Sequence, residues 1–245
     1  MTQPRMDGRL ALVTGATRGI GRAVALAFAK AGAHVILTGR TAGALTEVDD
    51  EIRSVTGKPD GATLITLNLK HGDKLDTLGP SLYTRFGKLD VVVSCAGILG
   101  TLTPVGHITT DAWAEVMDIN LTANMRLIRT LHPLLERSDA GRAIFVTSGA
   151  AVAKNAYWAP YAVSKAGLDA LVKTYALEVA NTNVRANLLS PGPIATAMRA
   201  KAFPGEDAST LKTAADIAPA FIKLADPKLT ENGRIYDAKT TSWLG

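Results

Sequence analysis

Residues 10–21 have the sequence LALVTGATRGIG, in which an apolar run leads directly into a glycine-rich turn. The run Leu10–Thr14 predicts a strand that is buried on both faces, and the apolar pattern after Gly21 predicts a helix over 22–31. Glycines allow a tight turn and close backbone approach, while the N-terminus of a helix offers free N–H groups to a pyrophosphate. A strand, this turn and a helix in that order indicate a dinucleotide-binding loop, with a plain β–α turn as the alternative.

Apolar runs and helical patterns alternate along the rest of the chain. We expect further strands at 34–38, 63–67, 89–94, 143–147, 184–190 and 234–238, and helices at 42–55, 71–86, 110–131, 157–179 and 215–224. Gly79-Pro80 is expected to interrupt the second of these helices, and Thr110 to cap the third. The alternation predicts an α/β fold, a single Rossmann-type domain over 1–245 with a doubly wound parallel sheet of about seven strands.

Length and composition exclude several classes of protein. The 245 residues are 47% hydrophobic, which is enough for a sizeable core, and the single cysteine, Cys95, excludes an intrachain disulfide. Residues 1–8 lack the apolar centre of a signal peptide, and no apolar run approaches the roughly 18 residues of a membrane span. The net charge is +5, but the Lys and Arg residues are scattered, which favours a solvated surface over nucleic-acid binding. We therefore expect a cytoplasmic protein that binds neither membrane nor nucleic acid.

Two arginines lie where the adenosine half of a dinucleotide would bind. Arg18 is inside the glycine-rich turn, and Arg40 follows the strand at 34–38, where many NAD-binding folds place an acidic residue. Two guanidinium groups suit a 2′-phosphate, which a carboxylate would repel. NADP(H) is therefore favoured over NAD(H), with two ordinary surface arginines as the alternative. The strand at 63–67 ends in Asn68-Leu69, where an adenine could rest.

A tyrosine and a lysine four residues apart, Tyr161 and Lys165, lie on one face of the helix expected at 157–179. A nearby ammonium favours the phenolate and lowers a tyrosine pKa from its usual value of about 10. A phenol tuned in this way can donate or accept a proton near neutral pH. Such pairs also occur by chance on helix surfaces, so the pair alone assigns no function.

Several motifs together resemble those of the short-chain dehydrogenase/reductase family, over essentially the whole chain. The segment Thr14-Gly15-x-x-x-Gly19-x-Gly21 resembles its cofactor loop, and Ala96-Gly97 resembles the end of its Asn-Asn-Ala-Gly motif. Pro191-Gly192 followed by Thr196 resembles its nicotinamide-side loop. Four residues match its catalytic set, with the serine 13 positions before the tyrosine: Asn120, Ser148, Tyr161 and Lys165.

This resemblance implies a role for each residue. Tyr161 would donate a proton to a carbonyl oxygen during reduction, Lys165 would lower the tyrosine pKa and hold the nicotinamide ribose, and Ser148 would bind the substrate oxygen. Asn120 would seat a water that resupplies protons. A strand-end serine and a helix-packing amide are the structural alternatives for Ser148 and Asn120. The implied cofactor-binding residues, with no metal, are Gly15, Thr17, Arg18, Gly19, Ile20, Gly21, Arg40, Asn68, Leu69, Ala96, Gly97, Tyr161, Lys165, Pro191, Gly192, Ile194 and Thr196.

The chain also departs from the family pattern. Ser94-Cys95 replaces two asparagines, which alters the side-chain support of that strand, and Asn68 replaces an aspartate near the adenine. The stretches Arg199–Pro204 and Trp243–Gly245 resemble a bacterial branch known mostly as oxidoreductases of unassigned substrate. The irregular segment around 193–213 is expected to be the substrate loop, either a mobile lid or an ordinary surface loop.

The sequence thus predicts an NADP(H)-dependent oxidoreductase that interconverts a carbonyl and a secondary alcohol by hydride transfer, with Tyr161 as general acid and base. Ile98, Leu99 and the small residues Gly149–Ala151 indicate an apolar pocket for a small-molecule substrate. The resemblance further implies a homodimer or homotetramer built through the long helices that contain Asn120 and Tyr161. The alternative function is a nucleotide-sensing regulatory or binding protein on the same fold. The catalytic set favours the enzyme, because a pure sensor has no chemical need for it.

Overall fold

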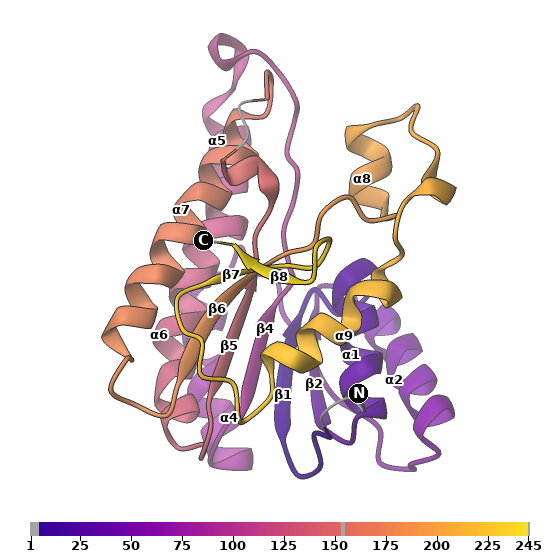
Figure 1. Cartoon of the computed structure of the whole chain (residues 1–245), viewed down its shortest axis with the longest axis vertical. Coiled ribbons are helices and arrows are strands. Elements are labelled where there is room, and N and C mark those ends of the chain that lie inside the picture. Colours follow the sequence, from indigo (N-terminus) through magenta and orange to yellow (C-terminus); the bar gives the residue numbers. More distant parts are fainter. Residues whose placement is uncertain (1–4, 153–154, 245) are drawn as a thin grey trace.

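One sheet of eight strands runs through the described residues, 5–152 and 155–244, of the computed structural model (Figure 1). The strands are β1 Leu10–Thr14, β2 His34–Gly39, β3 Thr63–Thr66, β4 Val91–Ser94, β5 Arg142–Val146, β6 Arg185–Ser190, β7 Ile235–Asp237 and β8 Ser242–Leu244. They lie in the order β3-β2-β1-β4-β5-β6-β7-β8, and all neighbours are parallel except β7 and β8. The order reverses between β1 and β4, which is the switch point where such sheets bind ligands.

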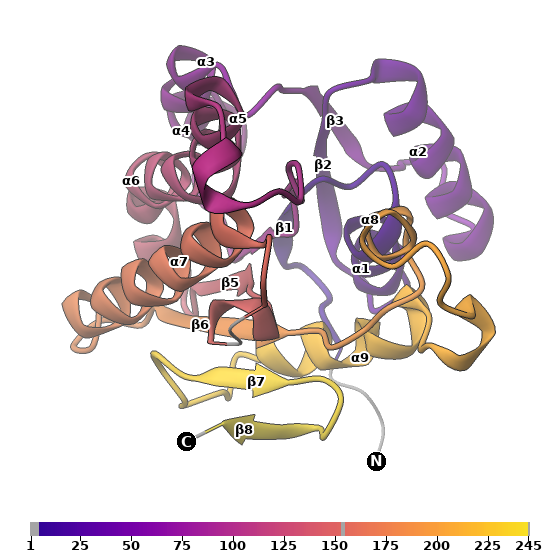
Figure 2. The same cartoon turned by 90° about the horizontal axis from the view of Figure 1, so that it is seen from above.

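Helices cover both faces of the sheet (Figure 2). They are α1 Gly19–Lys30, α2 Ala42–Thr56, α3 Gly72–Asp76, α4 Leu78–Phe86, α5 Thr110–Met117, α6 Ala123–Glu136, α7 Ala159–Glu178, α8 Ala197–Ala202 and α9 Ala214–Leu224. Ala11 and Val13 of β1 pack into the core with α1, α2 and α9, whereas Leu10 and Leu12 pack into the core with α4, α6 and α7. Because both faces of the strands are buried, the sheet is doubly wound, as the sequence predicts.

β8 lies beyond the roughly seven strands that the sequence predicts. Its three residues pair antiparallel with β7, and the Trp243 ring packs edge-on against Tyr236, with 5.2 Å between ring centroids. Arg234 lies over the same indole, 5.5 Å from its centroid. The residues Ser242–Leu244 show no apolar run or alternation of strand length, and the pairing with β7 and these ring contacts reveal the strand. Gly245, the last residue of this tail, lies outside the described residues.

The helix expected over 110–131 differs from the prediction at two points. A π-helical turn, Asp118–Thr122, separates α5 from α6. The N-cap is Thr109 rather than Thr110, since Thr109 Oγ1 accepts a hydrogen bond from Ala112 N at 3.2 Å. Single-turn π segments are rare and often lie at functional sites, which directs attention to the residues inside this one.

The break between α3 and α4 falls at Thr77 rather than at Gly79-Pro80. Pro80 stands in the first turn of α4, where its missing N–H would have no helical partner, so it does not interrupt the helix. None of the helices within the described ranges combines the length and apolar character that a membrane span requires.

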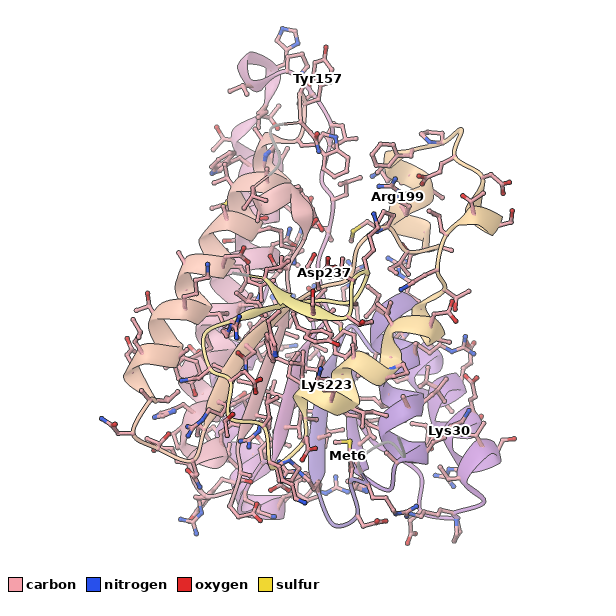
Figure 3. The ribbon with its side chains drawn as sticks, in the orientation of Figure 1. Met6, Lys30, Tyr157, Arg199, Lys223 and Asp237 are labelled. Carbon is pink, nitrogen blue, oxygen red and sulfur yellow. The ribbon has the colours of Figure 1, made fainter. Side chains whose placement is uncertain are left out.

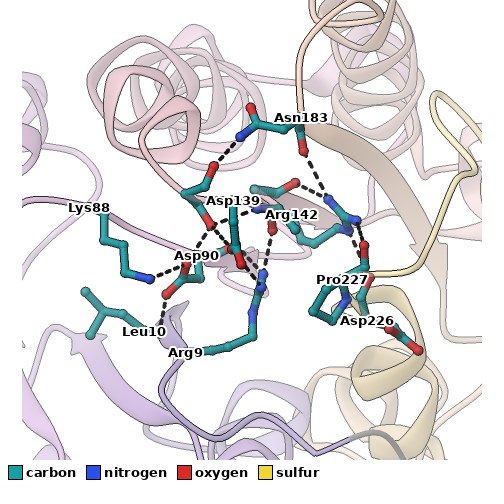
Figure 4. A network of polar contacts seen from close by, with 12 residues as sticks. Arg9, Leu10, Lys88, Asp90, Asp139, Arg142, Asn183, Asp226 and Pro227 are labelled. Atoms are coloured by element: carbon teal, nitrogen blue, oxygen red, sulfur yellow. Dashed lines mark hydrogen bonds and ion pairs between the residues drawn. The ribbon is translucent and has the colours of Figure 1, made fainter.

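A polar network joins the starts of several strands, at the opposite end of the sheet from the glycine-rich turn (Figure 4). Arg142 at the start of β5 is 3% exposed and donates to backbone carbonyls of the loop 226–229. Asp90, which is fully buried, accepts from Leu10 N at 2.8 Å and from Ser138 Oγ at 2.5 Å. These bonds satisfy buried polar groups that would otherwise destabilise the fold.

We expect Asp90→Asn to lower the free energy of unfolding by about 1–3 kcal/mol at pH 7 in urea titrations. Burial alone raises the pKa of Asp90, but hydrogen bonds from Ser138, Leu10 and Lys88 outweigh it and hold that pKa below its usual range. A carboxylate whose pKa falls on folding stabilises the fold above its unfolded pKa of about 3.9, and this contribution is lost as the pH falls further. The difference in free energy of unfolding between wild type and Asp90→Asn should therefore be smaller at pH 3 than at pH 7.

The matched control is Asp50→Asn, which removes an exposed carboxylate from α2. It should change the free energy of unfolding neither at pH 7 nor at pH 3. An unchanged urea midpoint for Asp90→Asn at pH 7 would contradict the stabilising role of the network.

Candidate active site

The turn between β1 and α1 is built around glycines. Gly15 and Gly19 have φ of +64° and +55°, which favour glycine over other residues. A Cβ on Gly21 would lie 2.3 Å from Gly15 O, and one on Gly15 would lie 2.9 Å from Ala96 Cα, so a side chain fits at neither position. α1 begins at Gly19 without a side-chain cap from Arg18, which leaves its first N–H groups available to an anion.

The two arginines expected to bind a 2′-phosphate lie on neighbouring turns. A Cβ on Gly39 would lie 2.7 Å from Thr17 Cγ2, so the end of β2 contacts the glycine-rich turn. Arg18 and Arg40 follow these two contact points directly, and both are exposed. Arg18 and Arg40 therefore each follow one of two residues that contact each other, Thr17 and Gly39.

The residues after β3 lie beside this basic region. Asn68 Oδ1 accepts from Lys70 N at 3.2 Å, so the oxygen expected to bind an adenine also stabilises its own turn. Lys70 pairs with Glu115 at 2.5 Å, and this pair, with a smaller effect from Arg40, holds the pKa of Glu115 below its usual range. Glu115 therefore connects the turn after β3, through Lys70, with Arg40 after β2.

The loop after β6 also reaches the glycine-rich turn. Pro191 begins it, and Gly192 has a φ of +73°, which lets the chain turn sharply. Ile194 is buried, and Thr196 caps α8 with its side chain. A Cβ on Gly19 would lie 3.7 Å from Thr196 Cγ2, which is ordinary van der Waals contact. The predicted nicotinamide-side residues therefore lie next to the predicted pyrophosphate loop.

Lys165 is a buried cation at the centre of the site. Its Nζ donates to the carbonyl oxygen of Val146, the last residue of β5, at 2.8 Å. A Cβ on Gly97 would lie 3.8 Å from Lys165 Nζ and 3.3 Å from Asn120 Oδ1, so both groups converge on Gly97. Burial lowers the pKa of Lys165 to about 8, against the opposing effect of Asp169.

Tyr161 lies one turn before Lys165 on the same face of α7. Its side chain is buried, and burial raises the pKa of the phenol, while the Ser148 hydroxyl acts in the opposite direction. Lys165 Nζ lies 5.9 Å from the Tyr161 ring centroid and donates to β5 instead. The prediction that the pKa of Tyr161 is lower than usual is therefore wrong for this structure, because desolvation is the larger effect and raises that pKa. Ser148, Tyr161 and Lys165 are nevertheless brought together.

The π-helical turn directs the Asn120 side chain toward the loop after β4. Asn120 Oδ1 accepts from Ile98 N and Nδ2 donates to Ile98 O, both at 2.9 Å. Nδ2 also donates to Ser164 Oγ at 3.1 Å, and Ser164 Oγ donates to Tyr161 O at 2.8 Å. The amide therefore joins the loop after β4 to α7. Its role in seating a water stays a prediction.

A chain of buried polar contacts, which sequence reasoning missed, continues from Asn120 to β1. Asn124 Nδ2 donates to Asn120 O at 2.8 Å, and Ser94 Oγ donates to Asn124 Oδ1 at 2.6 Å. Thr14 Oγ1 lies 3.4 Å from Ser94 Oγ and accepts from Ala96 N at 3.2 Å. Ser94 thus supports its strand through an asparagine on α6. The available signal was spacing, because Asn124 lies one turn after Asn120 on the same helix face.

Apolar side chains pack around Tyr161 and connect it to α8. The Trp158 ring lies edge-on to Tyr161, with 5.9 Å between centroids, and 5.7 Å from the Phe203 ring. Arg199 of α8 (Figure 3) lies 3.7 Å from the Phe203 centroid and pairs with Glu206 through contacts of 2.5 and 2.6 Å. The cluster comprises Leu99, Leu102, Ala150, Trp158, Tyr161, Met198 and Ala202. The segment 193–213 therefore contacts the site through α8.

Several known proteins are similar to this chain in sequence, and solved structures share its fold. The family model for short chain dehydrogenases matches residues 9–207. An uncharacterized oxidoreductase, YciK of Escherichia coli K12, is 36% identical over 241 residues, which cover 97% of this chain and 95% of the relative. A 3-oxoacyl-[acyl-carrier-protein] reductase of Synechocystis is 34% identical over 193 residues, which cover 79% of this chain and 77% of the relative. The crystal structure of a short chain dehydrogenase from Escherichia coli CFT073, complexed with NADPH, matches with a TM-score of 0.93 at 36% identity and covers 98% of this chain and 100% of that one.

The matched family model includes the glycine-rich turn, the segment from Ser148 to Lys165 and the loop after β6. The E. coli relative and the solved structure extend the match over nearly the whole length of each chain. The chain therefore belongs to the short-chain dehydrogenase/reductase family of oxidoreductases.

Proposed function

We propose that the chain is an NADP(H)-dependent oxidoreductase that interconverts a carbonyl and a secondary alcohol by hydride transfer. The observation that carries the proposal is the convergence of Ser148, Tyr161 and Lys165 at the end of β5, with the Lys165 ammonium also close to Gly97. One relative named for 3-oxoacyl reduction and one solved structure that holds NADPH support the choice of reaction and cofactor. The chain would act as a single NAD(P)-binding domain, with 193–213 as its substrate loop.

The residues present fit a dinucleotide. The turn leaves no room for a Cβ at Gly15 or Gly21, and the first N–H groups of α1 suit a pyrophosphate. Arg18 and Arg40 would hold the 2′-phosphate. When bound, the nicotinamide supplies or accepts the hydride. The further proposed contacts are Thr17, Gly19, Ile20, Asn68, Leu69, Ala96, Gly97, Tyr161, Lys165, Pro191, Gly192, Ile194 and Thr196.

Tyr161 acts as general acid in the reduction and as general base in the reverse direction. The phenol carries the proton that a carbonyl oxygen would receive; burial raises the phenol pKa and makes it a weaker acid, and the Ser148 hydroxyl opposes that rise. Ser148 donates a hydrogen bond to the same oxygen and stabilises the negative charge that develops there. Lys165, a cation 5.9 Å from the Tyr161 ring centroid, stabilises the phenolate that remains after proton transfer.

The side chains around Tyr161 favour a substrate with apolar substituents. Leu99, Ala150 and Met198 contribute only hydrocarbon or thioether groups to the cluster. The nearby cation, Arg199, is already paired with Glu206, so it offers little to an anionic substrate. A small apolar ketone fits such a lining better than a carboxylate or a phosphate ester.

The chain also forms a homodimer or homotetramer in this proposal, through the helices around Asn120 and Tyr161. A groove of about 440 Å³ lies between α6 and α7, and Met125, Ile128 and Leu171 contribute to its lining. Leu177 on α7 is 79% exposed. Packing this face against a second copy would remove apolar surface from water.

Tyr161→Phe tests the proposed reaction. Removing only the hydroxyl abolishes proton transfer, so we expect kcat for NADPH-dependent reduction to fall about 10²–10⁴-fold, in absorbance assays over a panel of carbonyl compounds. NADPH affinity, measured by fluorescence titration, should stay within about twofold of wild type, because the phenol is not needed to hold the phosphates. The control Tyr83→Phe alters an exposed tyrosine on α4 and should leave turnover unchanged. Turnover that survives Tyr161→Phe would remove this residue from its role.

Arg40→Ala tests the cofactor preference. Wild type should bind NADPH more tightly than NADH, and loss of one charge-assisted contact should weaken NADPH binding about tenfold while NADH binding changes little. The control Lys30→Ala removes a charge from the far end of α1 and should affect neither cofactor. Equal affinities for the two cofactors in wild type would overturn the assignment.

Leu177→Lys tests the proposed assembly. Light scattering of wild type at micromolar concentration should give two or four times the chain mass of 25.7 kDa, and the substitution should lower that mass because it buries a charge at the contact. Val55→Lys changes an exposed valine on α2 and should preserve the assembly. A wild-type mass of one chain would contradict the proposal.

A further inference from the structure

Three consecutive residues at the end of β5 each lie against a residue of α7. The contacts pair Ser148 with Tyr161, Val146 with Lys165 and Thr147 with Asp169. Because 3.6 residues make a helical turn, the partners at 161, 165 and 169 share one face of α7. The proposed reaction uses the first two pairs and leaves the pair of Thr147 and Asp169 unexplained.

Asp169 is a buried carboxylate. Its side chain is 8% exposed, and a buried charge is unfavourable unless it is paired or hydrogen-bonded. Thr147, the residue after β5, donates a hydrogen bond to it, and Lys165 and Lys173 are the charged groups that act on it from α7. Burial raises the pKa of Asp169, and these three partners oppose the rise.

Lys165 is buried on the same helix face. Burial lowers its pKa to about 8, and two groups oppose the fall, Asp169 and Cys95. Cys95 carries no charge near neutral pH, because burial raises the pKa of its thiol to about 12. Of these two groups, Asp169 is therefore the one that acts as an anion and favours the ammonium form of Lys165.

We propose that Asp169 is a positioning residue of the active site, which keeps the Lys165 ammonium charged and holds the end of β5 in place through Thr147. This inference rests on the proposed function, in which Lys165 stabilises the Tyr161 phenolate. The two effects are separable. Asp169→Asn keeps an oxygen acceptor for Thr147 but removes the charge, whereas Thr147→Val removes the donor and keeps the charge.

Titration of Lys165 in the full chain, without substrate, tests the effect of the charge. Lysine Cε atoms are labelled with ¹³C, and the Lys165 resonance is assigned by its loss in Lys165→Arg. We expect a midpoint at about 8 in wild type and about 1 pH unit lower in Asp169→Asn, because loss of a neighbouring opposite charge disfavours the ammonium. Asp169→Glu should restore the midpoint, and Asp50→Asn on α2 should leave it unchanged. An unchanged midpoint in Asp169→Asn would overturn the proposal.

Kinetics test the effect on the site. With a ketone that wild type reduces, we expect kcat to fall at alkaline pH as Lys165 loses its proton. In Asp169→Asn this fall should occur about 1 pH unit lower, as the Lys165 midpoint does, so that kcat at pH 8 is about fivefold below wild type. Thr147→Val should lower kcat at every pH through displacement of Ser148, without moving the Lys165 midpoint. A Thr147→Val protein with wild-type kcat would contradict the second effect. Absence of turnover in wild type would refute the proposed function instead, and the Lys165 titration would still decide the role of Asp169.

Discussion

The packing of α7 against the end of β5 is the constraint on which the site depends. Lys165 loses its hydration in the interior, and its hydrogen bond to Val146 O and the charge of Asp169 offset part of that cost. Tyr161 lies one turn earlier, beside Ser148, so the end of the strand and the helix each supply part of the proposed proton-transfer site. A shift of the helix sequence by one residue would rotate these side chains by about 100° and separate them from the strand.

A buried polar chain holds the other side of the site. It runs from Thr14 of β1 through Ser94 and Asn124 to Asn120, and from there to α7. A network in which each member has a partner fixes one arrangement, because any displacement leaves a buried polar group unsatisfied. Ser94, one of the two residues at 94–95 where the family resemblance leads us to expect asparagines, is bound in this chain to the amide oxygen of Asn124 on α6.

Much of the fold was predictable because its signals are local. Apolar runs marked seven of the eight strands, and the glycine-rich turn marked the end of the sheet where the proposed cofactor site lies. The π-helical turn was not predictable, since five residues of π-helix and α-helix carry the same apolar pattern. Burial is not a local property of the sequence, so neither the raised pKa of Tyr161 nor the burial of Asp169 could be predicted from spacing. The spacing of Asn124, one turn after Asn120, marks a shared helix face, but spacing alone does not show that this face is buried until its neighbours are known.

In the proposed reaction, Ser148 and Tyr161 act together on one substrate oxygen, and Lys165 stabilises the Tyr161 phenolate. A double-mutant cycle on kcat measures this directly, through Ser148→Ala, Tyr161→Phe and the double variant in reduction of the same ketone by NADPH. Groups that act as a unit in one transition state give grossly non-additive losses. We expect the double variant to lose little more activity than Tyr161→Phe alone. Losses that multiply, as they do for independent sites, would contradict a shared site.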